Sequence, residues 1–308
     1  MNDHPASIDS ATIAPHIFTL TGNLLAELTL EFDSWEPGRT SRARRDSFQV
    51  GGKGLNVSRM LTRLQVSNTA ICFTGGAPGT ECETWLKERG LRYRAFATST
   101  ATRTGTVVRD QSGRFGETTF LGPDAAPDAR AIAACAAFLD EQPDAQVLVL
   151  AGSFPGWNSP DFDPLRHALD RWLTRGHLVA DTYGPPLAWA AERPLALVKI
   201  NADELRALPR SRPGADSDAL PPTVKRWVIT DGPGPIELRD GDGIRTRLTP
   251  PNVQQISPTG SGDVLLACML NPLFALGYSL ADAVRTAIPY AAANAAHPGV
   301  AEFPLPPG

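Results

Sequence analysis

The stretch Pro258-Thr-Gly-Ser-Gly-Asp263 runs directly into the apolar segment Val264-Leu-Leu-Ala-Cys-Met-Leu270. This pattern predicts a tight turn followed by a buried helix that begins near Asp263. The first N–H groups of such a helix lack partners within the helix, and its dipole places partial positive charge at the same end. Gly260 and Gly262 allow a close backbone approach to a ligand. The stretch therefore predicts an anion hole that contains one carboxylate, although a simple capped loop before a helix gives the same pattern.

A second glycine-rich corner lies about 200 residues earlier, at Val50-Gly-Gly-Lys-Gly-Leu-Asn56-Val57. Val57, Met60, Leu61 and Leu64 follow at helical spacing, which predicts a buried helical stripe. Lys53 and Asn56 are placed to reach a polar ligand. The spacing of a Walker A motif is absent.

Composition narrows the class of protein. The chain has 308 residues, 42% apolar residues and a net charge of −4, which argues against a general nucleic-acid binder. Its four cysteines and five histidines are scattered without metal-ligand spacing, so a zinc site is not expected. Because the N-terminus lacks a signal-peptide pattern and no apolar run could span a membrane, we expect a soluble cytoplasmic protein without a membrane or nucleic-acid partner.

From residue 127 onward, predicted helices and strands alternate, which indicates a mostly parallel sheet with helices on both faces. Strands are expected at 146–150, 177–181, 195–198 and 225–230, with helices at 128–141, 159–175, 263–277 and 280–296. Polar or glycine residues follow the strands, and in such sheets ligands bind beyond the carboxyl ends of the strands. These residues are Gly152, Asp181, Lys199, Asn201, Glu204, Thr230, Gly232 and the segment 260–263. Residues 1–15 and 209–222 are expected to be a loose arm and a surface loop.

The N-terminal half contains shorter strands. Residues 26–33 alternate strictly between apolar and polar, so one face of this strand is expected to be wet and to meet either solvent or a polar ligand. Together with strands within 93–120, this segment predicts a small separate sheet. Four arginines within 39–45, and Arg103, are either solvated surface residues or contacts for a substrate phosphate.

Both glycine-rich corners resemble signatures of the ribokinase-like (PfkB) carbohydrate kinases, and most closely those of the 1-phosphofructokinase and tagatose-6-phosphate kinase branch. Lys199-Ile-Asn201-Ala-Asp-Glu204 is similar to the Lys-Pro-Asn-x-x-Glu segment of that family, and Thr102-Arg103-Thr104 to its Thr-Arg-Thr. The resemblance implies a single three-layer α/β domain over 1–308, with a mostly parallel central sheet. It also implies a small β-sheet lid formed by about 24–50 and 91–121, which pairs with a second subunit in a homodimer.

The resemblance also implies roles for individual residues. Asp263 would be the catalytic base, with Gly260, Ser261 and Gly262 as the anion hole. The acceptor sugar would contact Glu27, Gly51, Gly52, Lys53, Asn56, Arg103 and Ser153. ATP would contact Lys199, Asn201, Glu204, Thr230, Asp231, Gly232, Gly234 and Asn294. Asn201 and Glu204 would address Mg²⁺ through water. Because Asp263 lies at a helix N-terminus, we expect it to be ionised and therefore a weak base.

The expected reaction is ATP-dependent phosphorylation of a phosphosugar, fructose 1-phosphate first. Glu27 stands where the family has Asp, and Asp231-Gly232-Pro233 differs from the usual nucleotide loop. Two alternatives therefore stay open. One is a kinase for tagatose 6-phosphate, ribose or a nucleoside, and the other is a non-catalytic sugar-phosphate or nucleotide sensor. A dinucleotide-binding dehydrogenase is not expected, because no GxGxxG follows the first strand.

Overall fold

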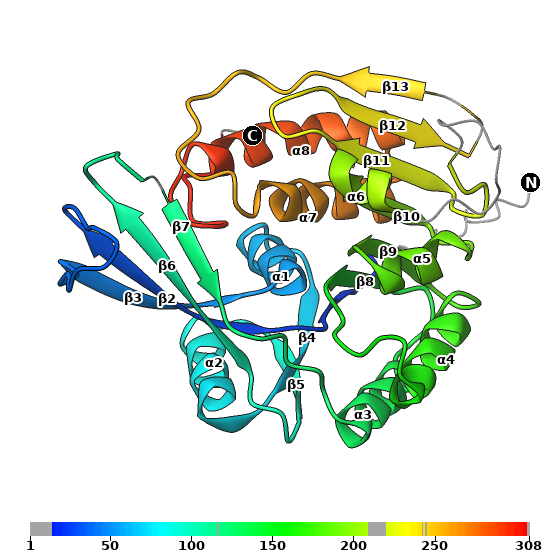
Figure 1. The fold of residues 1–308 in the computed structure, drawn as a ribbon. Helices are drawn as coiled ribbons and strands as arrows, with labels where there is room; N and C mark the ends of the chain where they lie inside the picture. Colours follow the sequence, from blue (N-terminus) through cyan, green and yellow to red (C-terminus); the bar gives the residue numbers. More distant parts are fainter. Residues whose placement is uncertain (1–13, 116, 209–219, 242, 244, 307–308) are drawn as a thin grey trace, which may run out of the picture.

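The computed structural model describes residues 14–115, 117–208, 220–241, 243 and 245–306, which form two sheets of unequal size (Figure 1). The large sheet contains, in spatial order, β13 (Arg245–Leu248), β12 (Ile236–Asp240), β11 (Arg226–Thr230), β10 (Leu197–Asn201), β9 (His177–Thr182), β8 (Val147–Gly152), β1 (Ile17–Thr21), β4 (Asn68–Thr74) and β5 (Tyr93–Ala97). The strands from β11 to β5 pair in parallel, whereas β12 and β13 are antiparallel. The predicted mixed α/β fold with a mostly parallel sheet is confirmed.

Helices cover both faces of the large sheet (Figure 1). One face carries α1 (Lys53–Arg63), α2 (Gly76–Glu88), α7 (Ser261–Phe274) and α8 (Leu280–Ala295), and the other carries α3 (Ala129–Asp140), α4 (Asp163–Trp172), α5 (Pro185–Ala191) and the short α6 (Ala202–Ala207). In β8, Val147 and Val149 pack toward α7 while Leu148 and Leu150 pack toward α3 and α4. All four are fully buried, because both faces of this strand are covered. Burial on two faces explains the unbroken apolar run in the sequence.

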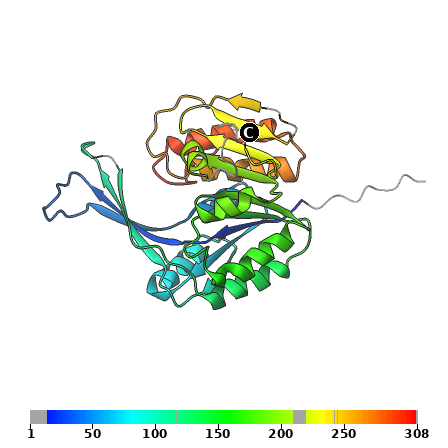
Figure 2. The ribbon, with the colours of Figure 1, turned by 45° about the vertical axis from the view of Figure 1, so that its right-hand side comes forward.

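The second sheet projects from one side of this body (Figure 2). It contains, in spatial order, β3 (Arg45–Gly51), β2 (Leu25–Phe32), β6 (Arg103–Asp110) and β7 (Glu117–Leu121). The segment expected to form part of the lid, 91–121, includes one strand that does not belong to the second sheet. Tyr93–Ala97 pairs in parallel with β4 as the edge of the large sheet, where buried Phe96 packs against Phe73 and Phe138.

The alternation predicted for residues 26–33 is present, but burial does not follow it. Glu27 faces the large cavity described below, and Thr29, two residues on, is only 2% exposed. Leu28, on the opposite face, is 37% exposed. The sheet stands away from the body, so that its apolar side is partly uncovered. On the polar side of β2, Glu27 therefore faces a cavity rather than open solvent.

Several local details differ from the sequence predictions. The helix expected over 159–175 is divided into a 3-10 turn, η1 (Pro160–Phe162), and α4, with Ser159 capping the start through the Asp161 N–H. Helices α5 and α6 were not predicted, because each is under eight residues and has no complete apolar stripe.

The expected arm (1–15) and loop (209–222) lie mostly outside the described residues. No helix within the described part of the chain is long and apolar enough to cross a membrane.

The buried stripe of α7 provides a test of this core. Leu270 is fully buried between the sheet and α8, whereas Leu276, just beyond the same helix, is 58% exposed. Leu270→Ala should lower the free energy of unfolding by about 2–5 kcal/mol, since it removes buried methyl groups and leaves a cavity. Leu276→Ala should change it by less than about 1 kcal/mol. Urea unfolding followed by circular dichroism measures both, and equal effects would contradict this packing.

Candidate active site

A cavity of about 1190 Å³ lies beyond the carboxyl ends of the parallel strands, between the second sheet and the N-terminus of α7. Both glycine-rich corners, the ends of β10 and β11, and the inner face of the second sheet line it. Of the residues expected at the site, it is lined by Glu27, Gly51, Gly52, Lys53, Asn56, Arg103, Lys199, Asn201, Thr230, Asp231, Gly232, Gly260, Ser261, Gly262 and Asp263. Glu204, Gly234, Ser153 and Asn294 do not line it.

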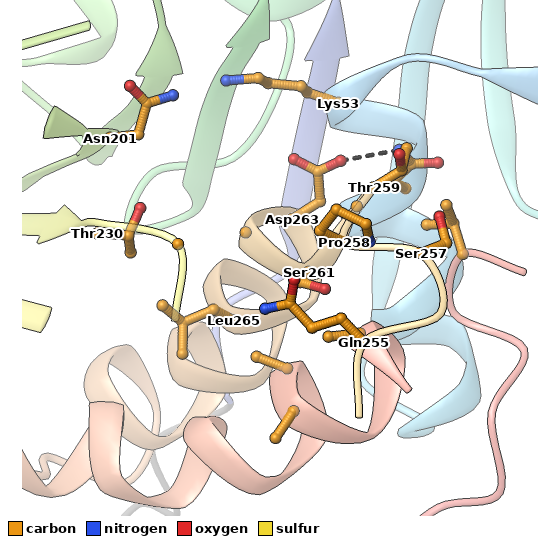
Figure 3. A pocket seen from close by; sticks show the side chains of 18 of the residues that line it. Lys53, Asn201, Thr230, Gln255, Ser257, Pro258, Thr259, Ser261, Asp263 and Leu265 are labelled. Carbon is orange, nitrogen blue, oxygen red and sulfur yellow. Dashed lines mark hydrogen bonds between the residues drawn. The ribbon is translucent and has the colours of Figure 1, made fainter. Parts of the chain in front are cut away.

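Asp263 lies in the first turn of α7 and points into this cavity (Figure 3). Its carboxylate accepts a hydrogen bond of 2.8 Å from Nδ2 of Asn56, which comes from the first turn of α1. Only glycine fits before the helix, because Gly260 has a φ of +76° and a Cβ there would lie 2.4 Å from Val300. The two corners that are distant in sequence therefore meet at one carboxylate.

The pKa of Asp263 is raised to about 6, first by burial and then by the negative charge of Asp181, while Lys199, Lys53 and the Asn56 amide act in the opposite direction. The helix dipole was expected to favour the ionised form and to make Asp263 a weak base. The direction of the pKa shift is the opposite, because a 5% exposed carboxylate has lost most of its hydration. Because the pKa of Asp263 is higher in the folded than in the unfolded state, its protonation contributes to the stability of the folded protein. The contribution is fully present below the pKa of the unfolded state and is lost as the pH rises through about 6.

Two lysines share one fully buried carboxylate beside Asp263. Asp181, near the end of β9, accepts from Lys53 at 2.8 Å and from Lys199 at 2.7 Å. Burial alone would raise the pKa of Asp181, but the charges of the two lysines hold it below its ordinary value. Burial acts to lower the pKa of Lys53, yet Asp181 and Glu204 hold it above its ordinary value. From the sequence, Asp181 was placed among the polar residues at strand ends and was given no role in the site. The signal for such a role was a carboxylate at the end of a buried strand.

The predicted segment 199–204 forms the end of β10 and the start of α6. Asn201 and Glu204 make a capping box, in which Asn201 Oδ1 accepts from the Glu204 N–H and Glu204 Oε2 accepts from the Asn201 N–H. Glu204 also pairs with Lys53 at 2.9 Å. Figure 3 shows Asn201 and Thr230 at the ends of their strands, on the side of the cavity where Lys53 and Asp263 also point.

The ammonium of Lys199 lies directly over the first turn of α7. A Cβ at Gly262 would be 2.6 Å from its Nζ atom, so the glycine allows this close approach. The lysine and the N–H groups of the turn thus place positive charge on one side of Asp263. Among the described residues, no group of three or more His, Cys, Asp or Glu side chains is arranged to hold a metal ion.

Asn294 was expected to contact the nucleotide, but its side chain is used within the protein. It is 1% exposed, donates to the Thr259 carbonyl at 3.0 Å and to Ser261 Oγ at 3.1 Å, and accepts from the Ala301 N–H at 2.8 Å. It therefore supports the turn at 259–261 from behind.

Arg103 and Ser153, two of the residues expected to contact the acceptor, both line a smaller pocket of about 90 Å³ next to Lys53. Glu27 faces the large cavity and accepts a hydrogen bond from Gln49. Burial raises the pKa of Glu27, while the Gln49 hydrogen bond acts to lower it.

The arginine cluster at 39–45 does not join these residues. It occupies the connection between β2 and β3, at the end of the hairpin opposite Gly51 (Figure 1). Eight residues of β2 separate the two ends, which is about 25 Å of extended chain. Of its two expected roles, the solvated surface is the one observed, with Arg44 pairing with exposed Asp33.

Comparisons with known proteins agree with this architecture. The 1-phosphofructokinase of Borreliella burgdorferi is 24% identical over 93% of this chain and 94% of that protein. The 1-phosphofructokinase of Bacillus subtilis is 30% identical, but that match spans only 61% of each protein. Tagatose-6-phosphate kinase of Staphylococcus epidermidis is 25% identical over 82% of this chain and 83% of its own length.

Solved structures show the same fold. Phosphofructokinase-2 from Escherichia coli in complex with potassium superposes with a TM-score of 0.81 at 24% identity, covering 93% of this chain and 94% of that one. Ribokinase from Thermotoga maritima superposes with a TM-score of 0.71 at 17% identity, covering 94% and 96%. The family model described as pfkB family carbohydrate kinase matches residues 20–307. The chain therefore belongs to the pfkB family of carbohydrate kinases.

Proposed function

We propose that this protein transfers the terminal phosphoryl group of ATP to a hydroxyl of a phosphosugar, with fructose 1-phosphate as the first candidate. The observation that carries the proposal is the position of Asp263: a buried carboxylate inside the first turn of α7, held by Asn56 and facing the large cavity. The relatives named 1-phosphofructokinase support the choice of sugar.

In this proposal Asp263 accepts the proton of the attacking hydroxyl. Its pKa of about 6 keeps it mostly ionised at neutral pH, and it is a stronger base than an ordinary aspartate. The N–H groups of the turn at 260–262 and the Lys199 ammonium stabilise the negative charge on the transferred group. Closure of the cavity by the second sheet excludes water, which limits ATP hydrolysis.

The nucleotide fits the side of the cavity formed by the ends of β10 and β11. Asn201, Thr230, Asp231 and Gly232 line this side, and Gly234 follows in the same turn. Mg²⁺ would supply charge neutralisation of the ATP phosphates. Both oxygens of Glu204 are engaged, one by Lys53 and one by the Asn201 N–H, which fits contact with the ion through water rather than direct ligation.

The acceptor fits between the second sheet and the corner at 51–56. Glu27, Gly51 and Gly52 line this part of the cavity, and Arg103 and Ser153 border its small side pocket. Arg103 is the residue we assign to the substrate phosphate, because a guanidinium matches phosphate oxygens with two donors.

The tagatose-6-phosphate kinases among the relatives make that sugar the second candidate. A coupled ADP-release assay with fructose 1-phosphate, tagatose 6-phosphate, ribose, adenosine and fructose decides between them. Turnover of fructose 1-phosphate with the highest kcat/KM supports the proposal. Absence of ADP release with every acceptor, combined with measurable sugar-phosphate binding, would make the protein a sensor instead.

The second sheet also suggests how two copies of the chain meet. Phe48, Leu28, Thr106 and Phe120 are successive cross-strand neighbours and therefore form one row on its outer face. Leu28 is 37% and Phe120 56% exposed. We propose that this row packs against the same row of a second subunit in a homodimer, since exposed apolar patches of this kind mark interaction sites.

Asp263→Asn removes the proposed base but keeps a side chain of the same shape that can accept from Asn56. We expect kcat to fall by at least about 10²–10⁴-fold, because general base catalysis contributes on this scale. ATP binding, measured by isothermal titration calorimetry, should stay within a few-fold of wild type. Near-wild-type turnover would rule out this role for Asp263.

The pH dependence of the reaction should report the same group. Since the ionised form of Asp263 is the base and its pKa is about 6, kcat/KM for the sugar should fall about tenfold per pH unit below pH 6 and be level above it. Initial rates from pH 4.5 to 8 measure this profile. An acid limb near pH 4, typical of an exposed aspartate, would contradict the burial argument.

The proposed dimer is tested by Phe120→Ser combined with Leu28→Ser. Sedimentation velocity at micromolar concentration should show a dimer for wild type and a monomer for this variant, because two exposed apolar anchors are lost. Tyr278→Ser removes a 44% exposed aromatic residue between α7 and α8 and should leave the dimer intact. A wild-type monomer would exclude this interface.

A further inference from the structure

The guanidinium that we assign to the substrate phosphate already has an anionic partner from the chain itself. Arg103 Nη1 donates to Asp124 Oδ1 at 3.2 Å, and Nη2 donates to the Asn23 carbonyl at 3.3 Å. Its Nε is buried without a hydrogen-bond partner. The side chain of Arg103 is only 14% exposed, so this cation is held in a fixed position at the edge of the small pocket.

The same carboxylate oxygen of Asp124 is held by a second donor. Asn23, which is 4% exposed, donates from Nδ2 to Asp124 Oδ1 at 2.7 Å and to Ser153 Oγ at 3.0 Å. Asn23, Arg103 and Ser153 all line the small pocket. The carboxylate of Asp124 therefore lies on a convergent set of donors, as an anion from a ligand would.

We propose that Asp124 is a specificity-determining residue of the acceptor site, because its carboxylate occupies the donors that an anionic group of the acceptor uses. A substrate phosphate must displace Asp124 from Arg103 and Asn23, so Asp124 weakens the binding of phosphorylated acceptors and leaves uncharged acceptors unaffected. This inference rests on the proposed function for the identity of the ligand, but the competition itself is a property of these three residues.

The exchange is feasible because the pair is weakly held on the Asp124 side. The Asp124 side chain is 60% exposed and uses one oxygen, and such exposed pairs contribute little stability.

Other cations that line the cavity have partners of their own. These are Lys53 with Asp181 and Glu204, Lys199 with Asp181, Arg59 with Glu302, and Arg109 with Glu117. Both Lys53 and Lys199 are tied to a fully buried carboxylate, whereas the partner of Arg103 can swing into solvent.

The test compares Asp124→Asn with the matched control Asp144→Asn. Asp144 pairs with Arg175 at 3.3 Å, with side-chain exposures of 77% and 19% that resemble those of the Asp124–Arg103 pair. Unlike Arg103, however, Arg175 lines neither of the two pockets. Binding of fructose 1-phosphate is measured by isothermal titration calorimetry without nucleotide, at low ionic strength, with fructose and inorganic phosphate as further probes.

Asp124→Asn should tighten fructose 1-phosphate binding by about two- to fivefold, the range that corresponds to an exposed ion pair. The affinity for inorganic phosphate should also increase, and the affinity for fructose should not change. Asp124→Glu should bind like wild type because it keeps the charge, and Asp144→Asn should also bind like wild type. In an Arg103→Ala background the effect of Asp124→Asn should disappear.

Unchanged or weaker binding of fructose 1-phosphate by Asp124→Asn overturns the inference, and so does an equal gain for fructose. The inference is also overturned if neither the wild-type protein nor Asp124→Asn binds fructose 1-phosphate measurably. The proposed function fails separately: a wild-type protein that binds fructose 1-phosphate but releases no ADP with it is not this kinase, while the comparison of Asp124→Asn with wild type still measures competition at Arg103.

Discussion

The hydrogen bond between Asn56 and Asp263 is the contact on which the geometry of the site depends. It joins the first turns of α1 and α7, which are 207 residues apart in sequence. An amide donor satisfies the carboxylate without neutralising it. A lysine in the same place would have lowered the pKa of Asp263 and made it a weaker base. Because both helices pack on the same face of the sheet, their N-termini open toward one space at its carboxyl edge.

The neighbouring lysines would otherwise dominate this carboxylate. Lys53 and Lys199 are instead held by Asp181, which is fully buried and takes one lysine on each oxygen. A buried pair is costly to form, and removing one member would leave an uncompensated charge inside the protein. The arrangement fixes the direction of both ammonium groups while its own carboxylate raises the pKa of Asp263. One buried acid thus contacts both lysines and adds to the effect of burial on Asp263.

Much of this could be predicted from the sequence, because glycine corners, strand ends and unbroken apolar runs are local patterns. The run at 146–150 predicted a strand covered on both faces, and β8 is one. Other features could not be predicted because they depend on contacts between segments that are distant in sequence. Tyr93–Ala97 has the composition of either sheet. It joins the large one through contacts that are distant in sequence, namely its pairing with β4 and the packing of Phe96 against Phe73 and Phe138. The burial of Asp263 could not be inferred from its helix position, which by itself predicted the opposite pKa shift.

The acceptor side shows why a motif does not determine specificity by itself. Thr102-Arg103-Thr104 matches a phosphate-binding pattern, yet whether Arg103 is available depends on Asp124, on the connection that follows β7, and on Asn23 beyond β1. These three residues come from separate segments and meet only when the second sheet is placed against the body. A carboxylate on this connection changes the charge that a substrate meets without altering either signature. In the proposed acceptor site, substrate preference depends on the tertiary contacts around Arg103 rather than on Arg103 alone.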